Sequence, residues 1–252
     1  MSELWGVGVG PGDPELVTLK ALRVLREVDV VFVPVMTAGE RGRAEAIIEA
    51  HLPEVVLHRL VFALNDEVTG PQERRRQHWD AAAATVAEHL RTHGGSGAPG
   101  ARSTYSAAFA TIGDPAVYST FGYLAQGVRD ALPDVVVRTV PGITAMQAAA
   151  SAAGVVLVEG TEPLTLLPLS RELDVLTDAL TRPGAVVAYK GGRRLAQVRE
   201  ALGEHVSRAV LAEHLGTPDE RVRPLAEVTE DTVPYLSTIV ITPPRGGAGD
   251  QL

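Results

Sequence analysis

Residues 4–34 read LWGVGVGPGDPELVTLKALRVLREVDVVFVP, and this stretch decides the fold class. An apolar segment at residues 4–9 runs into glycines and predicts a short strand. Asp13 and Pro14 suit a helix start, because Asp accepts from free N–H groups and Pro fits the first turn. The helix is expected to reach about residue 27, with one apolar face formed by residues at every third position, Leu16, Leu19, Leu22 and Leu25. A buried strand at residues 30–34 follows, which completes the βαβ unit of a parallel sheet.

The rest of the chain continues this alternation of strands and helices. Further strands are expected at residues 55–60, 107–112, 135–140, 164–167, 185–189, 209–213 and 236–242. Further helices are expected at residues 43–51, 72–92, from beyond Pro115 to about 132, 145–153, 172–180 and 195–202. By composition, residues 94–103 and the tail 243–252 are expected to be loose. We therefore predict an α/β protein with two α/β domains, residues 1–141 and 142–252, and a ligand cleft between them at the carboxyl ends of strands.

Composition excludes several classes of function. The 252 residues include 23 Lys and Arg against 31 Asp and Glu, a formal charge of −8, which argues against nucleic acid as a partner. The absence of cysteine excludes disulfides, thiolate metal sites and cysteine nucleophiles. The seven histidines show no ligand spacing, so no metal is expected. With no basic leader and no apolar run near ~20 residues, we expect a cytoplasmic enzyme without a membrane partner.

The glycine-rich loop does not fit the frequent nucleotide-binding designs. Its alternating glycines are Gly6, Gly8, Gly10 and Gly12. A G-x-G-x-x-G pattern that starts at Gly6 meets Pro11 at its third glycine, and one that starts at Gly8 meets Asp13. The chain has no Gly-Lys pair for a phosphate-binding loop, and Leu4 stands where the common methyltransferase fold has an acid. Taken alone, the loop is as well explained as a tight turn before a capped helix.

Four segments, in order, resemble the signatures of the tetrapyrrole methylases, which are two-domain enzymes that use S-adenosylmethionine. They are residues 8–21 (GVGPGDPELVTLKA), residues 113–120 (GDPAVYST), residues 140–145 (VPGITA) and residues 237–240 (STIV). One such motif is weak, but four in sequence over about 230 residues are specific. The resemblance implies the tetrapyrrole methylase fold (class III methyltransferase), with a substrate-side N-terminal domain, a cofactor-side C-terminal domain and a homodimer.

Within this family, the chain most resembles the precorrin-2 carbon-20 methyltransferases. The segments that carry this resemblance are residues 14–20, 33–35, 43–44, 120–124 and 190–195. It implies methyl transfer to carbon 20 of precorrin-2 in cobalamin biosynthesis. Ile112 and the loose stretch 94–103 depart from the family pattern, and because neither falls in the cofactor motifs, they bear only on the detail of the substrate side. Alternatives are methylation of cobalt-factor II, of another corrin or porphyrinogen position, or of a protein as in diphthamide formation, and a non-catalytic nucleotide-binding module.

The resemblance also assigns a cofactor pocket. Its residues are Pro11, Gly113, Asp114, Val117, Ser119, Thr120, Thr144, Ala145, Tyr189, Lys190, Thr238 and Ile239. Asp114 either binds a ribose hydroxyl or the methionyl ammonium, or ties its own turn. Thr144 either meets the ligand or caps a helix, and Ile239 is equally suited to a core strand. No catalytic residue is assigned, because an enamine-like ring carbon needs mainly positioning and exclusion of water.

The substrate carries many carboxylates, although the protein has a negative net charge. Its attraction depends on the electrostatic field near the site and not on the net charge, so we expect basic side chains close to the substrate. Arginine suits the substrate carboxylates through its forked donors. We favour Arg41 and Arg43, which follow the strand at residues 30–34, and assign Gly12 and Asp13 of the glycine loop to the substrate side. Other basic candidates are equally explained as solvated helix faces: Lys20, the run Arg74-Arg75-Arg76 and the pair Arg193-Arg194.

Overall fold

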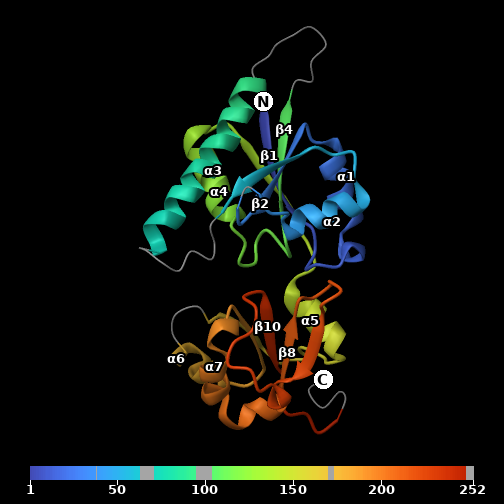
Figure 1. Ribbon diagram of the computed structural model, residues 1–252, viewed down its shortest axis with the longest axis vertical. Coiled ribbons are helices and arrows are strands. Elements are labelled where there is room, and N and C mark those ends of the chain that lie inside the picture. Colours follow the sequence, from blue (N-terminus) through green and yellow to red (C-terminus); the bar gives the residue numbers. More distant parts are fainter. Residues whose placement is uncertain (38, 63–70, 95–103, 170–172, 248–252) are drawn as a thin grey trace. The chain divides into compact units, whose positions relative to one another are not determined.

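The structure is a computed structural model that describes all residues except 38, 63–70, 95–103, 170–172 and 248–252. It divides into two compact units, Met1–Thr144 and Ala145–Leu252 (Figure 1). Each unit contains a five-stranded sheet with helices, which confirms the expected α/β class. None of the described helices has the length and apolar character needed to cross a membrane.

Unit 1 is built on a parallel sheet with the strand order β3-β2-β4-β1-β5. Its strands are β1 (Ser2–Gly8), β2 (Val30–Val35), β3 (Leu57–Val61), β4 (Tyr105–Thr111) and β5 (Val136–Val140). Its helices are α1 (Leu19–Glu27), α2 (Arg43–His51), α3 (Pro71–Gly94) and α4 (Phe121–Ala131), with a short 3-10 turn η1 (Pro14–Leu16). As the βαβ reading of the first residues predicts, β1 and β2 are parallel, although β4 lies between them.

Apolar cores fill both faces of this sheet. Successive side chains of a strand point to opposite faces, so Val30 and Phe32 pack with α3 and α4, whereas Val31 and Val33 pack with α1 and α2. Figure 1 shows the two helix pairs on opposite sides of the sheet. Burial on both faces explains why these strands are nearly continuous apolar runs in the sequence.

The chain reverses its direction of travel across the sheet between β1 and β4. The connection from β1 through α1 leads to β2 on one side, whereas the connection from β4 through α4 leads to β5 on the other. Because β1 and β4 are hydrogen-bonded neighbours, their following loops diverge from a common point. In open α/β sheets, ligands bind at such a switch point, outside the carboxyl ends of the strands.

Unit 2 has a mixed sheet with the strand order β6-β7-β10-β8-β9. Its strands are β6 (Leu164–Pro168), β7 (Ala185–Tyr189), β8 (Ala209–Glu213), β9 (Arg221–Pro224) and β10 (Ser237–Ile241). Its α-helices are α5 (Ala145–Ala153), α6 (Asp174–Leu180) and α7 (Leu195–Leu202), with α6 and α7 packed on one face and α5 on the other. Only β6 and β7 pair in parallel. Strand β9 was not expected, because its sequence, RVRP, is a polar edge strand without an apolar run.

The predicted apolar face of the first helix is confirmed for Leu25 and Leu22, which pack in the core, and is wrong for Leu19. Asp13 caps the turn η1 by accepting from the Glu15 N–H, and the helix proper begins only after Thr18, which accepts from the Ala21 N–H. This start places Ala21, Val24 and Leu25 in the core and leaves Leu19 87% exposed. The leucines at every third position therefore do not all lie on the buried face of the helix.

The expectation of a loose tail is wrong at its beginning. The Arg245 guanidinium donates to the Glu162 carboxylate and to the carbonyls of Val156 and Leu157, and its side chain is only 17% exposed. Residues 95–103 and 248–252, which were also expected to be loose, lie outside the described residues.

Candidate active site

Three loops of unit 1 meet at the carboxyl edge of its sheet, after the neighbouring strands β4, β1 and β5. The Val9 N–H donates to the Thr111 carbonyl at 3.0 Å, and the Gly113 N–H donates to the Gly10 carbonyl at 2.8 Å. Gly10 and Gly113 thus form an isolated bridge beyond the strand ends. The glycine loop and the GDP loop are therefore fixed to each other at the switch point.

Glycine is required here by the close approach of three backbones. A Cβ on Gly142 would lie 2.1 Å from the Gly113 carbonyl oxygen, and a Cβ on Gly8 would lie 2.5 Å from the same atom. Gly10 and Gly113 also have left-handed backbones, with φ of +85° and +68°. These contacts explain the glycines without any phosphate ligand.

Asp114 ties two of these loops together. Its Oδ1 accepts the Ala116 N–H at 2.7 Å within the turn, and its Oδ2 accepts the Gly142 N–H at 2.9 Å from the loop after β5. The turn-tying role considered for this residue is thus present in the structure. A contact with a ligand remains a prediction, and both carboxylate oxygens already have a backbone partner.

The neighbouring hydroxyl groups are also used within the loop. Ser119 Oγ lies 3.0 Å from Thr111 Oγ1 and accepts the Phe121 N–H at 3.1 Å at the start of α4. Thr120 occupies the N-cap position of α4 without a side-chain cap bond. Thr144 is buried directly before α5, which begins at Ala145.

Seven of the assigned donor residues therefore lie at one edge of unit 1. They are Pro11, Gly113, Asp114, Val117, Ser119, Thr120 and Thr144. Pro11 is buried and Val117 is half-buried. The substrate-side residues Gly12 and Asp13 belong to the same edge, through the loop after β1.

In unit 2, four assigned residues lie on two paired strands or directly after one of them. Thr238 of β10 pairs with Tyr189 at the end of β7, Ile239 pairs with Ala188, and Lys190 follows β7 with a φ of +63°. Ile239 is 1% exposed and lies in the core, which agrees with the alternative expectation that it belongs to a core strand. The neighbouring Ser237 lies in the fourth signature segment but was not assigned to the pocket, and its Oγ is buried and has no hydrogen-bond partner among the described residues.

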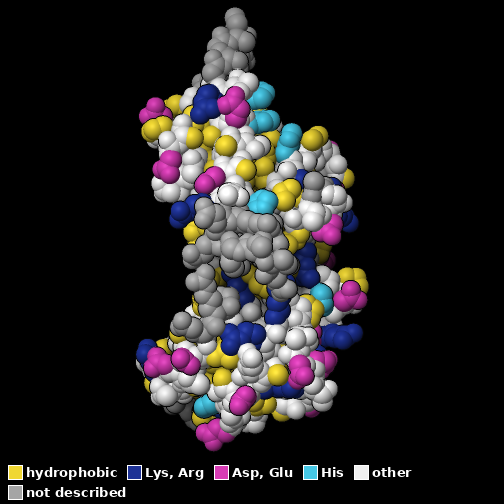
Figure 2. All heavy atoms as spheres, turned by 60° about the vertical axis from the view of Figure 1, so that its left-hand side comes forward, with side chains coloured by type: hydrophobic (Ala, Val, Ile, Leu, Met, Phe, Trp, Pro, Cys, Tyr) yellow, Lys and Arg dark blue, Asp and Glu magenta, His cyan; other side chains and the backbone are white. Residues whose placement is uncertain are grey.

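The two favoured arginines differ in environment. Arg41 is exposed and forms an ion pair with Glu49. Arg43 is the first residue of α2, is half-buried, and has a pKa lowered by burial. On the face shown in Figure 2, basic side chains occur in groups as well as singly among acidic ones, so the net charge does not describe the local field.

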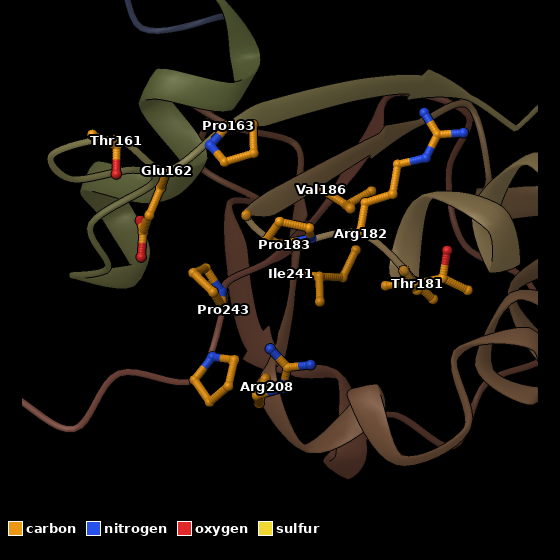
Figure 3. Close-up of a pocket in the computed structure, with 13 residues that line it drawn as sticks. Thr161, Glu162, Pro163, Thr181, Arg182, Pro183, Val186, Arg208, Ile241 and Pro243 are labelled. Atoms are coloured by element: carbon orange, nitrogen blue, oxygen red, sulfur yellow. The ribbon is translucent and has the colours of Figure 1, made fainter. Parts of the chain in front are cut away.

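One cavity of the described residues lies away from these positions. It measures about 550 Å³ and is bordered by Val186 near the start of β7 and Ile241 at the end of β10. Figure 3 shows prolines and Arg208 around it, and this guanidinium donates to the Thr242 carbonyl at 2.6 Å. No assigned residue lines this cavity. Within the described chain, no group of three or more His, Cys, Asp or Glu side chains is arranged to hold a metal ion.

Comparison with known proteins identifies the family. The sequence model described as Tetrapyrrole (Corrin/Porphyrin) Methylases matches residues 3–229. The chain belongs to the tetrapyrrole methylase family. The first three signature segments lie within the matched region and include loops of the unit 1 edge described above, whereas the fourth, residues 237–240, lies beyond it.

Named relatives of this tetrapyrrole methylase act in cobalamin biosynthesis. It is 35% identical over 241 residues to the cobalamin biosynthesis protein CobIJ of Mycobacterium tuberculosis, with 94% of this chain and 45% of that protein covered. The chain thus spans about half of CobIJ. It is 32% identical over 248 residues to the precorrin-2 C(20)-methyltransferase of a Sinorhizobium species, with 96% and 95% covered.

A solved relative supports the fold. The uroporphyrin-III C-methyl transferase of Thermus thermophilus, complexed with S-adenyl homocysteine, has a TM-score of 0.60 and 22% identity, with 95% of this chain and 92% of that chain covered.

Proposed function

We propose that this tetrapyrrole methylase transfers a methyl group from S-adenosylmethionine to carbon 20 of precorrin-2. The observation that carries the proposal is the similarity to the precorrin-2 C(20)-methyltransferase, which extends over 95% of that protein's length. The bound S-adenyl homocysteine in the structural relative supports the identity of the donor. We further propose that the protein works in the cytoplasm as a homodimer.

The residues at the switch point of unit 1 fit such a donor. The glycine backbones of this edge are close-packed, because a Cβ at Gly8 or Gly142 would meet backbone atoms of the neighbouring loops, so the loops are held tightly together where we place the donor. A sulfonium nucleoside carries no phosphate, so it needs no anion-binding loop, in keeping with Asp13 at the first turn after β1. In this proposal, the donor contacts are the seven residues of unit 1 named above together with Ala145, Tyr189, Lys190, Thr238 and Ile239 of unit 2.

The chemistry asks for positioning more than for acid or base groups. The ring carbon attacks the methyl carbon in line, the carbon–sulfur bond breaks with its electron pair on sulfur, and the ring carbon later releases its proton. A positive sulfonium becomes a neutral thioether, so exclusion of water and correct orientation supply much of the rate. Asp114 serves this purpose as a positioning residue, because it fixes the loop after β4 to the loop after β5.

The substrate carboxylates require cations on the same edge. Arg43 is favoured for this role because it is half-buried at the start of α2, and burial lowers its pKa by weakening the hydration of its guanidinium. A substrate carboxylate placed there would be attracted by the guanidinium and by the N-terminal end of the helix dipole. Arg41 is the second candidate. Gly12 and Asp13 would border the macrocycle from the loop after β1.

The test is a comparison of acceptors with the purified protein. Precorrin-2, cobalt-factor II and uroporphyrinogen III are each incubated with donor carrying a ¹³C-methyl group, and products are followed by mass spectrometry and NMR. We expect one methyl group at carbon 20 of precorrin-2 and binding of S-adenosylhomocysteine by calorimetry. Preferred methylation of another acceptor or position would correct the substrate, and donor binding without turnover on any acceptor would favour a non-catalytic module. Binding of a nicotinamide or nucleoside triphosphate in place of the donor would refute the reading.

A further inference from the structure

The cavity of unit 2 drawn in Figure 3 has the size of a small-molecule binding site. Its volume of about 550 Å³ falls within the usual range of ligand pockets, roughly 300–1,000 Å³. It lies beside Val186 near the start of β7 and Ile241 at the end of β10, whereas Tyr189 and Thr238 lie at the other ends of these two strands. The cavity is therefore separate from the donor contacts proposed for unit 2.

The apolar wall of the cavity is rigid. Val186 and Ile241 are paired strand residues that are 4% and 2% exposed. The segment before β7 is held against Pro163, because the Ala185 N–H donates to the Pro163 carbonyl at 3.0 Å and a Cβ on Gly184 would lie 2.1 Å from the oxygen of that group. Four prolines, whose rings fix the backbone angle φ, complete the wall: Pro163, Pro183, Pro243 and Pro244. A preformed wall of this kind adds little ordering cost when a ligand binds.

Arg208 brings a positive charge to the cavity that no carboxylate of the described residues neutralises. It ends the 3-10 segment η3 (Gly203–Arg208), and the pairing of β8 with β10 places it opposite Thr242. Its Nη1 donates to the Thr242 carbonyl at 2.6 Å, and its Nη2 donates to His205 Nδ1. A carbonyl and an accepting imidazole nitrogen carry no negative charge, so these partners orient the guanidinium without forming an ion pair. The remaining N–H groups of the fork are available to a ligand.

The other charged side chains that border the cavity already have charged partners. Arg182 donates to the Asp178 carboxylate at 2.6 Å, and its side chain is 67% exposed. The Glu162 carboxylate is bound by Arg245. In Figure 3, the guanidinium of Arg182 lies apart from that of Arg208. One uncompensated cation beside an apolar wall neutralises a single negative charge, whereas the further charges of a polyanion would stay unpaired beside apolar groups.

We infer that this cavity binds a small organic molecule with one carboxylate, which accepts hydrogen bonds from Arg208 while its apolar body lies against the prolines and strand residues of the wall. The forked guanidinium can donate to both oxygens of a carboxylate. A phosphate monoester carries almost two negative charges, about one more than Arg208 neutralises. This site is additional to those of the proposed methyl transfer, and the inference does not depend on that function.

The test uses four probes and two variants of the full chain. Phenylpropionate carries one carboxylate, phenylpropionamide is its uncharged counterpart, and phenylsuccinate and inorganic phosphate carry more charge. Each is titrated by calorimetry and by ligand-observed NMR. Arg208→Gln removes the uncompensated charge. Arg182→Gln is the matched control, because it removes an arginine of the same border that is already ion-paired. The Tm of each variant is measured alongside.

The loss of a hydrogen bond to a charged group sets the expected size of the effect. Phenylpropionate should bind with a Kd of about 1 mM or lower, and the amide should bind about tenfold more weakly or less well still. Arg208→Gln should weaken phenylpropionate binding about tenfold or more, whereas Arg182→Gln should change it by less than about twofold. If Arg208→Gln lowers the Tm, the comparison of the acid with its amide on the unaltered protein still decides.

Several results would overturn the inference. Equal affinity for the acid and the amide, or an Arg208→Gln variant that binds as the unaltered protein does, would show that the guanidinium does not hold the ligand. Tighter binding of phosphate or phenylsuccinate would show that the site takes a different class of anion. Displacement of phenylpropionate by S-adenosylhomocysteine would place the probe in the donor site.

Discussion

Replacing Gly142 by alanine should disrupt the edge of unit 1 at one defined point. The new Cβ would lie 2.1 Å from the Gly113 carbonyl oxygen and 2.9 Å from two backbone atoms of Gly8, whereas ordinary contact begins at 3.4 Å. All these neighbours are backbone atoms, so no flexible side chain can turn away. Movement of Gly142 would also strain the bond from its N–H to Asp114 Oδ2 at 2.9 Å. Overpacking costs about 1–3 kcal/mol, and a weakened bond to a carboxylate adds roughly 1 kcal/mol or more.

We therefore expect Gly142→Ala to lower the free energy of unfolding of unit 1 by about 3 kcal/mol. Urea unfolding followed by tryptophan fluorescence reports on this unit alone, because Trp5 and Trp79 are the two tryptophans of the chain. The Kd for S-adenosylhomocysteine should rise as well, since the displaced loops border the proposed donor site. The control is Gly122→Ala in α4, where an added Cβ meets nothing within 4 Å and should stabilise by roughly 0.5–1 kcal/mol. Equal stability of the two variants would refute the reasoning.

Three further perturbations test other parts of the structure. Acidification should destabilise unit 1, because burial and two neighbouring histidines lower the pKa of His89 below 6.5. As the pH falls, the unfolded chain therefore binds a proton at this histidine before the folded chain does. The contribution of His89 to the free energy of unfolding is complete above pH 6.5 and is lost as the pH drops toward the folded pKa. A His89→Gln variant whose free energy of unfolding in urea depends on pH in the same way as that of the unaltered protein would contradict this. Arg245→Ala should speed proteolysis of the carboxyl-terminal segment by removing the partner of Glu162, and cleavage at an unchanged rate would contradict the tie. Arg43→Glu should raise the KM for the tetrapyrrole about tenfold or more and leave donor affinity unchanged, and weakened donor binding would count against the assignment.

Much of the fold could be predicted where local signals bound an element on both sides. The helices at residues 43–51, 145–153 and 195–202 and the strands at 185–189 and 209–213 have the bounds predicted from the sequence. Position 144/145 divides the two compact units, close to the Pro141-Gly142 stop. The strand order and the antiparallel pairing of unit 2 could not be read in the same way, because they depend on contacts between segments far apart in the sequence.

The first helix shows how a good local pattern can mislead. Leucine at every third position suggested a continuous apolar face, but the capping bond from Ala21 N–H to Thr18 fixes where the helix begins. Once that start is set, the stripe with helical spacing is Ala21, Val24 and Leu25, and Leu19 points to solvent. The leucine pattern therefore included one residue too many at its start, where Leu19 lies in the first turn and outside the packed face.

At the candidate site, the loops could be identified from the sequence, but the hydrogen bonds between them could not. The family resemblance assigned residues near 11, 113 and 144 to one pocket, and in unit 1 the loops that carry them follow the neighbouring parallel strands β4, β1 and β5, whereas the binding of a donor there stays a prediction. That Asp114 divides its two oxygens between two loops depends on the distance between separate strand ends. The left-handed backbone of Tyr118 likewise accompanies the turn that brings Ser119 back to Thr111. No residue type in this segment predicts that turn.

The glycines of the first loop have a cause that differs from the one their spacing suggests. A phosphate-binding loop uses glycine to expose N–H groups to an anion, whereas Gly8 and Gly142 here allow separate backbones to approach each other. For a sulfonium donor, the second arrangement is the useful one, because the methyl must be held in line and there is no phosphate to neutralise. Three loops in mutual contact, with the Asp114 carboxylate bound between two of them, leave little room for this edge, the proposed donor site, to shift. A rigid edge of this kind is what catalysis by positioning requires, and it accounts for the absence of an obvious base in the motifs.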